Sequence, residues 1–135
     1  MTWPAHLPVR AVRVARPTDR LEAVVAFYVE VLGLRRIGGF TDHDGYTGVM
    51  VGLPDDSVHL ELTTHVGGSP GDAPSRDNLL VLYLPARADV DAVVARVEAA
   101  GHPVVEPENP YWRDRSVTVA DPDGWRVVLV DESYD

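Results

Sequence analysis

The sequence has no cysteine among its 135 residues. This absence excludes disulfide bonds, thiolate metal sites and a cysteine nucleophile, so any chemistry must come from histidine, carboxylate, arginine, tyrosine or hydroxyl groups. Positive charge is also scarce, because 12 lysine and arginine residues face 21 acidic ones and give a net charge of -9. We therefore expect neither nucleic acid nor an anionic membrane as a partner.

Long apolar runs are missing as well. None approaches the length that spans a bilayer, and the N-terminus lacks the basic and then apolar layout of a secretory signal. We expect a cytoplasmic protein. With 45% apolar residues, the length suits one compact domain with its own core, 1–135. A small-molecule ligand or another protein chain is the expected partner.

The order strand, helix and then three strands occurs twice along the chain. We expect one module at about 9–65 and a second at about 77–132, joined by the Gly/Pro/Ser-rich loop 66–76. Gly33 and Gly101 follow the two predicted helices as stops. The expected elements are strand 9–16, helix 20–32, strands 34–40, 46–53 and 58–63, then strand 78–84, helix 90–100 and strands 104–105, 116–120 and 125–130.

The two halves also share a short sequence match. Residues 22–26 (Glu-Ala-Val-Val-Ala) correspond to residues 91–95 (Asp-Ala-Val-Val-Ala), and 60–62 then fall over 127–129. An internal repeat is the simplest interpretation, although such a match can also arise by chance in helices rich in valine and alanine.

Candidate site residues gather on the strand 58–63. Leu60 and Leu62 share one face, whereas His59, Glu61 and Thr63 share the other, because strand side chains alternate. The polar face fits the lining of a site, but it fits a solvent-exposed sheet face equally well.

Three segments carry a resemblance to a known superfamily. They are 26–34 (Ala-Phe-Tyr to Leu-Gly-Leu), 59–63 (His-Leu-Glu-Leu-Thr) and 121–129 (Asp-Pro-Asp-Gly-Trp-Arg-Val-Val-Leu). With them the chain resembles the vicinal oxygen chelate superfamily, which includes glyoxalase I, fosfomycin-modifying enzymes, extradiol dioxygenases and bleomycin-resistance proteins. The resemblance implies an α+β fold in which two βαβββ modules form a cup-shaped sheet around a ligand. It also implies a homodimer.

The resemblance further implies metal ligands on the first and last strands of each module. Glu61 matches one such position, but the others fall on Val128, on Ala11 or Arg13, and near Leu79, none of which is a suitable ligand. We therefore expect no metal cofactor. A rearranged site that combines His43, His59 and Glu61 is the alternative, since two imidazoles and a carboxylate suit zinc, iron or nickel.

Further residues complete the predicted site. Arg13 either pairs with Glu61 as a structural ion pair or holds an anionic group of a ligand. Tyr83 adds a phenol to the cup and His43 lies at its rim. Tyr111 and Trp112 either form a stacking wall for a flat ligand or contact a second copy of the chain. Asp121 and Asp123 are expected to be turn residues without a functional role.

The preferred hypothesis is a metal-independent protein that binds a planar or anionic small molecule, with sequestration of a drug or metabolite as one version. The alternative is an enzyme, such as a lyase, isomerase or transferase. In that case Glu61 and His59 are the catalytic residues, acting as a general base or with His43 around a metal ion.

Overall fold

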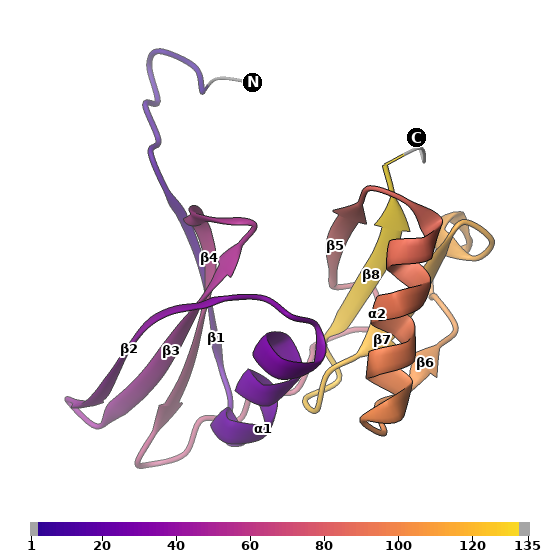
Figure 1. Ribbon diagram of the computed structural model, residues 1–135. Helices are drawn as coiled ribbons and strands as arrows, with labels where there is room; N and C mark the ends of the chain where they lie inside the picture. The colour runs from indigo at the N-terminus through magenta and orange to yellow at the C-terminus, as the bar shows by residue number, and fades with distance from the viewer. Residues whose placement is uncertain (1–2, 133–135) are drawn as a thin grey trace.

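The computed structural model describes residues 3–132, which form two four-stranded sheets with helices (Figure 1). The first module contains β1 (Val12–Pro17), α1 (Leu21–Ala26), the π-helix η1 (Phe27–Val31), β2 (Arg36–His43), β3 (Tyr46–Leu53) and β4 (Asp55–His65). The second contains β5 (Leu79–Leu84), α2 (Arg87–Ala99), β6 (Val104–Val105), the 3-10 helix η2 (Pro110–Trp112), β7 (Ser116–Ala120) and β8 (Arg126–Asp131). No helix in residues 3–132 is long and apolar enough to cross a membrane.

Both sheets have the same topology. Their strand orders are β1-β4-β3-β2 and β5-β8-β7-β6, and in each the first strand runs parallel to the last while the other pairs are antiparallel. The predicted fold of two βαβββ modules with cupped sheets is thereby confirmed. Leu60 pairs with Val14 in one module and Val127 with Leu80 in the other, so 60–62 and 127–129 hold equivalent places.

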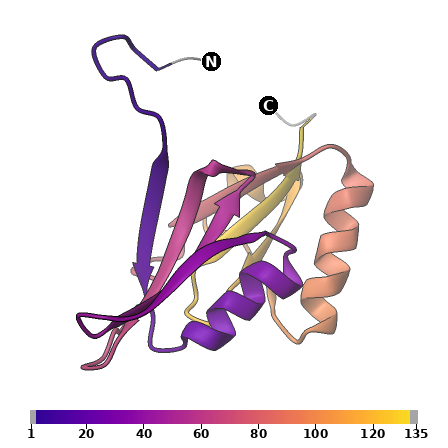
Figure 2. The ribbon, with the colours of Figure 1, turned by 60° about the vertical axis from the view of Figure 1, so that its left-hand side comes forward.

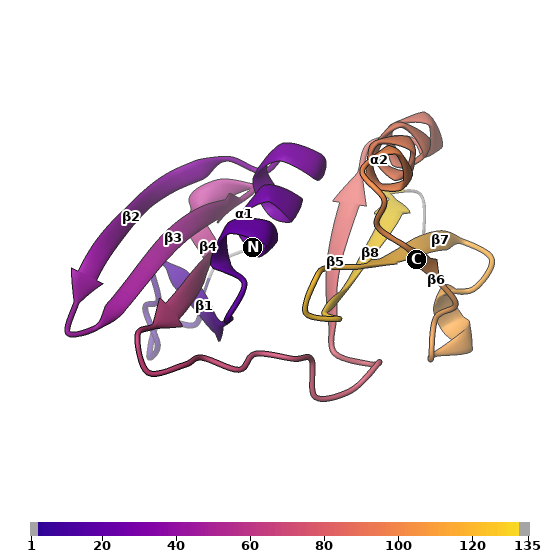
Figure 3. The same cartoon turned by 90° about the horizontal axis from the view of Figure 1, so that it is seen from below.

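The helices cover one face of each sheet. Figures 2 and 3 show α1 and α2 as neighbours, each lying against its own sheet. Leucine and valine side chains of both sheets join both helices in one core shared by the two modules. The opposite sheet faces carry the alternate residues, such as His59 and Glu61 on β4 and Val128 and Val130 on β8.

The first helix differs from the prediction in one detail. The apolar spacing predicts a single α-helix over 20–32, but its second half is the π-helix η1, in which the Leu32 amide donates to the Phe27 carbonyl at 2.9 Å. Gly33 and Gly101 follow the helices with φ of +92° and +85°, as the predicted stops require.

The strands β1 and β5 are less buried than the sequence indicates. Each lies at the end of its sheet and pairs with a single strand of the described chain. The apolar strand β5 is half-buried, and Tyr83 is 57% exposed. On β1, Val14 is 46% exposed. An apolar strand is expected to be buried on both faces. On an edge strand, however, side chains of a neighbouring strand lie on one side only, so more of each side chain stays exposed.

Hydrogen bonds between distant segments fix the modules to each other. The Arg96 side chain of α2 donates to the Val31 and Leu32 carbonyls, both at 3.0 Å. In the segment between the modules, the Gly71 carbonyl accepts from the Trp125 indole at 2.8 Å. This connecting loop is therefore attached to the second module despite its glycine-rich composition.

Candidate functional site

Three predicted residues meet on the open face of the first sheet. The parallel pairing of β1 with β4 places Arg13 opposite His59, and Ala15 opposite Glu61. Arg13 Nε donates to His59 Nε2 at 3.0 Å, and Arg13 Nη1 donates to Glu61 Oε2 at 2.9 Å. The side chains thus form one cluster, which we call the Arg13 cluster.

The hydrogen bonds assign the tautomer of His59. Because arginine has no lone pair, Nε2 must accept, and the ring proton therefore lies on Nδ1. From there it donates to the Asp56 carbonyl, 3.1 Å away. Both ring nitrogens of His59 are thereby occupied.

The cluster presents hydrogen-bond donors to solvent rather than a free base. The Glu61 side chain is only 15% exposed, whereas that of Arg13 is 49% exposed. Arg13 uses one N–H on each acceptor, and its remaining donors can reach a ligand at the surface. The arrangement can hold an acceptor or anionic group, and Arg13 already occupies His59 Nε2 and Glu61 Oε2.

His43 is not part of this cluster. It lies at the end of β2, opposite Tyr46, which in turn pairs with His65 at the far end of β4 from His59. Its side chain is 82% exposed, with Nε2 3.6 Å from Asp44 Oδ2. The alternative set of His43, His59 and Glu61 is therefore not assembled. Across residues 3–132, no three His, Asp or Glu side chains are grouped to hold a metal ion.

The residues at the superfamily's ligand positions do not fit its metal centre. The guanidinium of Arg13 lies against Glu61, where it would repel a divalent cation. The corresponding region of the second module offers Leu79 on β5 and the fully buried Val128 on β8. A single carboxylate that is already paired is a poor site for zinc, iron or nickel.

Residues 106–115 form a loop that is hydrogen-bonded to two strands of the second sheet. Arg126 donates to the Glu106 carbonyl at 2.8 Å, and Ser116 donates to the Trp112 carbonyl at 2.7 Å. On the equivalent face of the second sheet Val128 and Val130 are fully buried, and Thr118 is buried with no hydrogen-bond partner for its hydroxyl in the described part of the chain. Arg126 and Thr118 were not predicted. In the sequence they can be recognised only by their positions on β8 and β7, where they alternate with residues of the core.

The two predicted aromatic residues belong to this loop. The rings of Tyr111 and Trp112 meet edge to face, 4.9 Å apart, and η2 packs against β7. Figure 3 shows that part of the chain beside β6, at the end of the second sheet away from β5. Within one chain, Tyr111 and Trp112 therefore lie apart from the Arg13 cluster.

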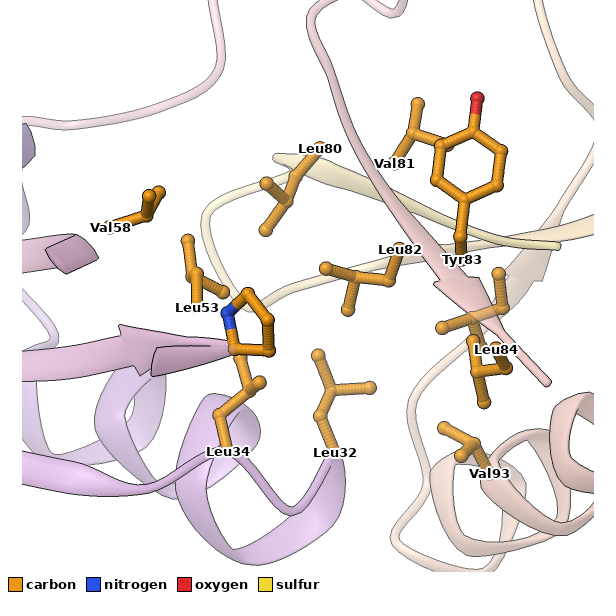
Figure 4. A pocket seen from close by; sticks show the side chains of 12 residues that line it. Leu32, Leu34, Leu53, Val58, Leu80, Val81, Leu82, Tyr83, Leu84 and Val93 are labelled. Carbon is orange, nitrogen blue, oxygen red and sulfur yellow. The ribbon is translucent and has the colours of Figure 1, made fainter. Parts of the chain in front are cut away.

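A separate pocket of about 510 Å³ lies between the modules. Leu80 and Leu82 of β5 point into it toward Leu53 and Val58 of the first module, whereas the Tyr83 hydroxyl points away (Figure 4). The lining is almost entirely apolar: Leu32, Leu34, Leu53, Pro54, Val58, Leu80, Val81, Leu82, Tyr83, Leu84, Val93 and Leu129. Of the predicted site residues, Tyr83 alone appears in this lining.

Asp121 links the two modules. Its carboxylate accepts from the buried Tyr28 hydroxyl at 2.7 Å and from the amides of Asp123 and Trp125. Burial raises the pKa of Asp121 above its usual range, against the opposing effect of these hydrogen bonds. Asp123 receives a hydrogen bond from Arg20 of the first module at 2.8 Å. Both residues lie at the predicted turn, and both also make contacts between the modules.

The chain matches two family models in succession. Residues 12–63 match the YycE-like N-terminal domain, and residues 77–131 match the YycE-like C-terminal domain. The chain belongs to the YycE-like family. A curated relative, the uncharacterized protein YycE of Bacillus subtilis (strain 168), is 47% identical over 119 residues, covering 88% of this chain and 86% of YycE.

Solved structures relate the YycE-like family to a wider group of proteins with the same fold. The crystal structure of a YycE protein of unknown function from Bacillus subtilis, related in its description to glyoxalase and fosfomycin resistance proteins, superposes with a TM-score of 0.91. It has 43% identity and covers 96% of this chain and 94% of that one. The chain is thus a member of the vicinal oxygen chelate superfamily, as predicted.

More distant structures share the fold. The trypanothione-dependent glyoxalase I of Leishmania major has a TM-score of 0.72 and 22% identity, covering 92% of this YycE-like chain and 87% of its own. TnmS3, an antibiotic binding protein from Streptomyces sp. CB03234, has a TM-score of 0.63 and 24% identity, with coverages of 90% and 93%.

Proposed function

We propose that this YycE-like protein is a metal-independent receptor for a small molecule, and that the Arg13 cluster holds an acceptor or anionic group of that ligand. The observation that carries this proposal is the guanidinium of Arg13, which donates to both His59 and Glu61. The guanidinium thus binds His59 and Glu61, the two side chains of the cluster that are most suited to metal binding or base catalysis. About half of the Arg13 side chain, 49%, stays exposed.

Sequestration of a drug or metabolite is the specific version that we favour. The fold shared with the antibiotic binding protein TnmS3 supports it, because the same scaffold there binds a small molecule. Tyr83, Tyr111 and Trp112 are proposed to contact a planar part of the ligand, and His43 to lie at the rim. An enzyme with Glu61 or His59 as general base would first have to withdraw Arg13, and this makes catalysis the weaker alternative.

We also propose that the protein is a homodimer. Among residues 3–132, β1 and β5 each have one edge without a strand partner, and Val14 and Tyr83 on these strands are 46% and 57% exposed. Unpaired edges with apolar side chains favour association with another chain. Because Tyr111 and Trp112 lie apart from the Arg13 cluster within one chain, their proposed contact with a ligand held there requires a second copy.

Calorimetric titration with Zn²⁺, Ni²⁺, Mn²⁺ and Fe²⁺ tests metal independence. We expect no tight one-to-one binding to the unmodified protein. Arg13→His should bind Zn²⁺ or Ni²⁺ at least tenfold more tightly, because it removes the cation and places a second imidazole beside His59 and Glu61. Arg13→Ala is the matched control, since it removes the charge without adding a ligand. Tight binding to the unmodified protein that Glu61→Ala abolishes would overturn the proposal.

Titration with a fluorescent aromatic carboxylate and its neutral amide tests the ligand class. The carboxylate should bind more tightly, and Arg13→Met should weaken its binding about tenfold or more, which corresponds to loss of a hydrogen bond to a charged group. Arg87→Met is the control, because Arg87 is also a half-exposed arginine in an ion pair, with Asp91 on α2. Equal binding of both probes to all variants would contradict the role of Arg13.

A further inference from the structure

Arg126, at the start of β8, is the one cation that is buried among residues 3–132. It is 9% exposed and lies on the sheet face turned away from α2, because its neighbours Val127 and Leu129 alternate with it and belong to the core. Arginine is rarely buried unless an anion neutralises its charge. The position of Arg126 therefore favours an anion close to its guanidinium.

The described part of the chain supplies no carboxylate for this arginine. Arg126 Nη1 donates to the backbone carbonyl of Glu106 at 2.8 Å. The Glu106 carboxylate is paired elsewhere, since its Oε1 accepts from Arg113 Nε at 2.8 Å. No ion pair within residues 3–132 joins Arg126 to an acidic side chain. The counter-ion of Arg126 must therefore come from outside these residues.

The free nitrogens of Arg126 form one edge of its guanidinium. Nη1 is occupied, so Nε and Nη2 remain, and these two nitrogens direct parallel N–H bonds to the same side. Two parallel donors match the two oxygens of a carboxylate better than they match a spherical halide or a single carbonyl oxygen. Arg13 cannot offer this edge, because its Nε is bound to His59. The free donors of Arg126 therefore favour a carboxylate.

A buried hydroxyl lies diagonally across from Arg126 on the same sheet face. In the pairing of β7 with β8, Ala120 is opposite Arg126 and Thr118 is opposite Val128. Such diagonal neighbours are about 7 to 8 Å apart, a distance that a long side chain can span. Thr118 is 2% exposed, and its hydroxyl has no hydrogen-bond partner among residues 3–132. A ligand oxygen placed between the two residues would accept from both of them.

Solvent reaches the free nitrogens of Arg126. Within residues 3–132, Thr118 Oγ1 is the only fully buried side-chain nitrogen or oxygen without a hydrogen bond, so Nε and Nη2 of Arg126 are not fully buried. Val128 and Val130 on the same face are fully buried and make the surroundings apolar. Hydrogen bonds to a charged group are stronger in such surroundings than in water. The site is therefore accessible at the arginine and apolar at depth.

We propose that Arg126 and Thr118 form a carboxylate-binding site on the second sheet, separate from the Arg13 cluster on the first. Nε and Nη2 of Arg126 donate side-on to the two carboxylate oxygens, and the Thr118 hydroxyl donates to the oxygen that lies deeper. The ligand is a small monocarboxylate or the carboxylate end of a larger molecule that extends to the surface past Arg126. This inference does not depend on the function proposed for the Arg13 cluster.

Titration with acetate, followed by nuclear magnetic resonance, tests the class of ligand. Acetate should produce saturable shifts of the backbone amide signals along β7 and the start of β8. Acetamide has the same shape without the charge, and chloride has the charge without the shape, so both should bind at least tenfold more weakly. Equal shifts with all three, or shifts that do not saturate, would overturn the proposal.

Substitution of the arginine tests its role in that binding. Arg126→Lys keeps the positive charge and loses the paired donors, so acetate should bind about tenfold or more weakly. Circular dichroism checks that the fold is retained. Arg87→Lys is the matched control, because Arg87 is a half-exposed arginine paired with Asp91 on α2. Acetate binding that Arg13→Met abolishes and Arg126→Lys leaves intact would place the carboxylate at the Arg13 cluster and refute the second site.

Thr118→Val separates a binding role of the hydroxyl from a structural one. It should weaken acetate binding several-fold without lowering the urea concentration at the midpoint of unfolding, because it replaces an unpartnered buried hydroxyl with a methyl group of similar shape. Unchanged acetate binding together with a lower midpoint would show that the hydroxyl stabilises the fold and would remove Thr118 from the site.

Discussion

At the residue scale, Tyr28 makes the most buried polar contact between the modules. Its ring is fully buried, and its hydroxyl donates to Asp121 at 2.7 Å and accepts from Arg16 at 3.3 Å. The two hydrogen-bonded residues Tyr28 and Asp121 are 93 positions apart in the sequence. Loss of this hydroxyl would leave a buried carboxylate with one donor fewer.

We expect Tyr28→Phe to lower the free energy of unfolding by about 1 to 3 kcal/mol at pH 7, because the buried oxygen Oδ2 of Asp121 loses the hydrogen bond from the tyrosine hydroxyl. Urea unfolding measures this change. Tyr83→Phe is the control, since Tyr83 is 57% exposed, and it should stay within about 0.5 kcal/mol of the unmodified protein. Equal loss in both variants would contradict the role assigned to the Tyr28–Asp121 hydrogen bond.

Tyr28 should also make stability depend on alkaline pH. Burial, and then the negative charge of Asp121, raise the pKa of Tyr28 far above its ordinary value of about 10. Above pH 10 the unfolded chain releases this proton and the folded chain keeps it, so the free energy of unfolding falls as pH rises. The stability difference between the unmodified protein and Tyr28→Phe should therefore shrink between pH 9 and 11. A constant difference would show that Tyr28 ionises freely in the folded protein.

Sequence reasoning located part of the candidate site at this scale. Alternation along 58–63 predicted that His59 and Glu61 share a face, and Arg13 was expected to pair with Glu61 or to hold a ligand; the three side chains meet on that face. It did not find Arg126 or Thr118, because their burial depends on packing against parts of the chain that are distant from them in the sequence. Such long-range packing leaves no periodic signal.

At the element scale, the segment between the modules depends on a close backbone approach at Gly71. A Cβ atom at this position would lie 1.8 Å from the Pro17 carbonyl oxygen, a distance that no side chain can occupy. The neighbouring backbone is held by the Trp125 indole and by a hydrogen bond from the Ala73 amide to the Asp123 carbonyl. Glycine is thus required here for space.

We expect Gly71→Ala to destabilise the protein by at least about 1 to 3 kcal/mol, the usual cost of forcing extra atoms into a packed site. Thermal and urea unfolding measure it. Gly38→Ala is the matched control, because a Cβ there meets only the flexible end of Met50 at 3.9 Å. The explanation fails if Gly71→Ala unfolds at the same urea concentration as Gly38→Ala.

The elements themselves were predictable where local periodicity dominates. The two helices, the short strand 104–105 and the final hairpin appear close to their expected bounds. The π-helix η1 was not predictable, since α and π turns have the same apolar spacing over a few residues. The exposure of β5 could not be predicted either, because an apolar strand has the same sequence pattern at the edge and in the middle of a sheet.

At the scale of the whole molecule, the modules share one core and several polar contacts. Trp125 reports on their contact, because its indole donates to Gly71 and its ring lies 4.3 Å from the guanidinium carbon of Arg16. That residues 1–135 behave as a single domain of two modules stays a prediction, and unfolding experiments can test it.

We expect a single cooperative unfolding transition. In a variant with Trp3→Phe and Trp112→Phe, emission of Trp125 should change at the same urea concentration as the far-ultraviolet circular dichroism, since separating the modules would expose their common core. Coincident curves are the expected result. An earlier fluorescence transition would mean that the modules separate before they unfold.

The duplicated architecture was accessible from sequence, because each module repeats the same order of elements. The relative placement of the modules was not. It depends on contacts such as Tyr28 with Asp121, whose partners are far apart in sequence and unremarkable on their own. This placement determines that the Arg13 cluster and the aromatic loop lie apart within one chain.

The position of Arg13 also has an evolutionary consequence. Two of the arginine codons become histidine codons through a single base change, and histidine at position 13 would stand beside His59 and Glu61. From either of those codons, one point mutation exchanges a guanidinium for an imidazole at the centre of the cluster. The exchange would place two imidazoles and a carboxylate together, a donor set suited to zinc or nickel, on an unchanged scaffold.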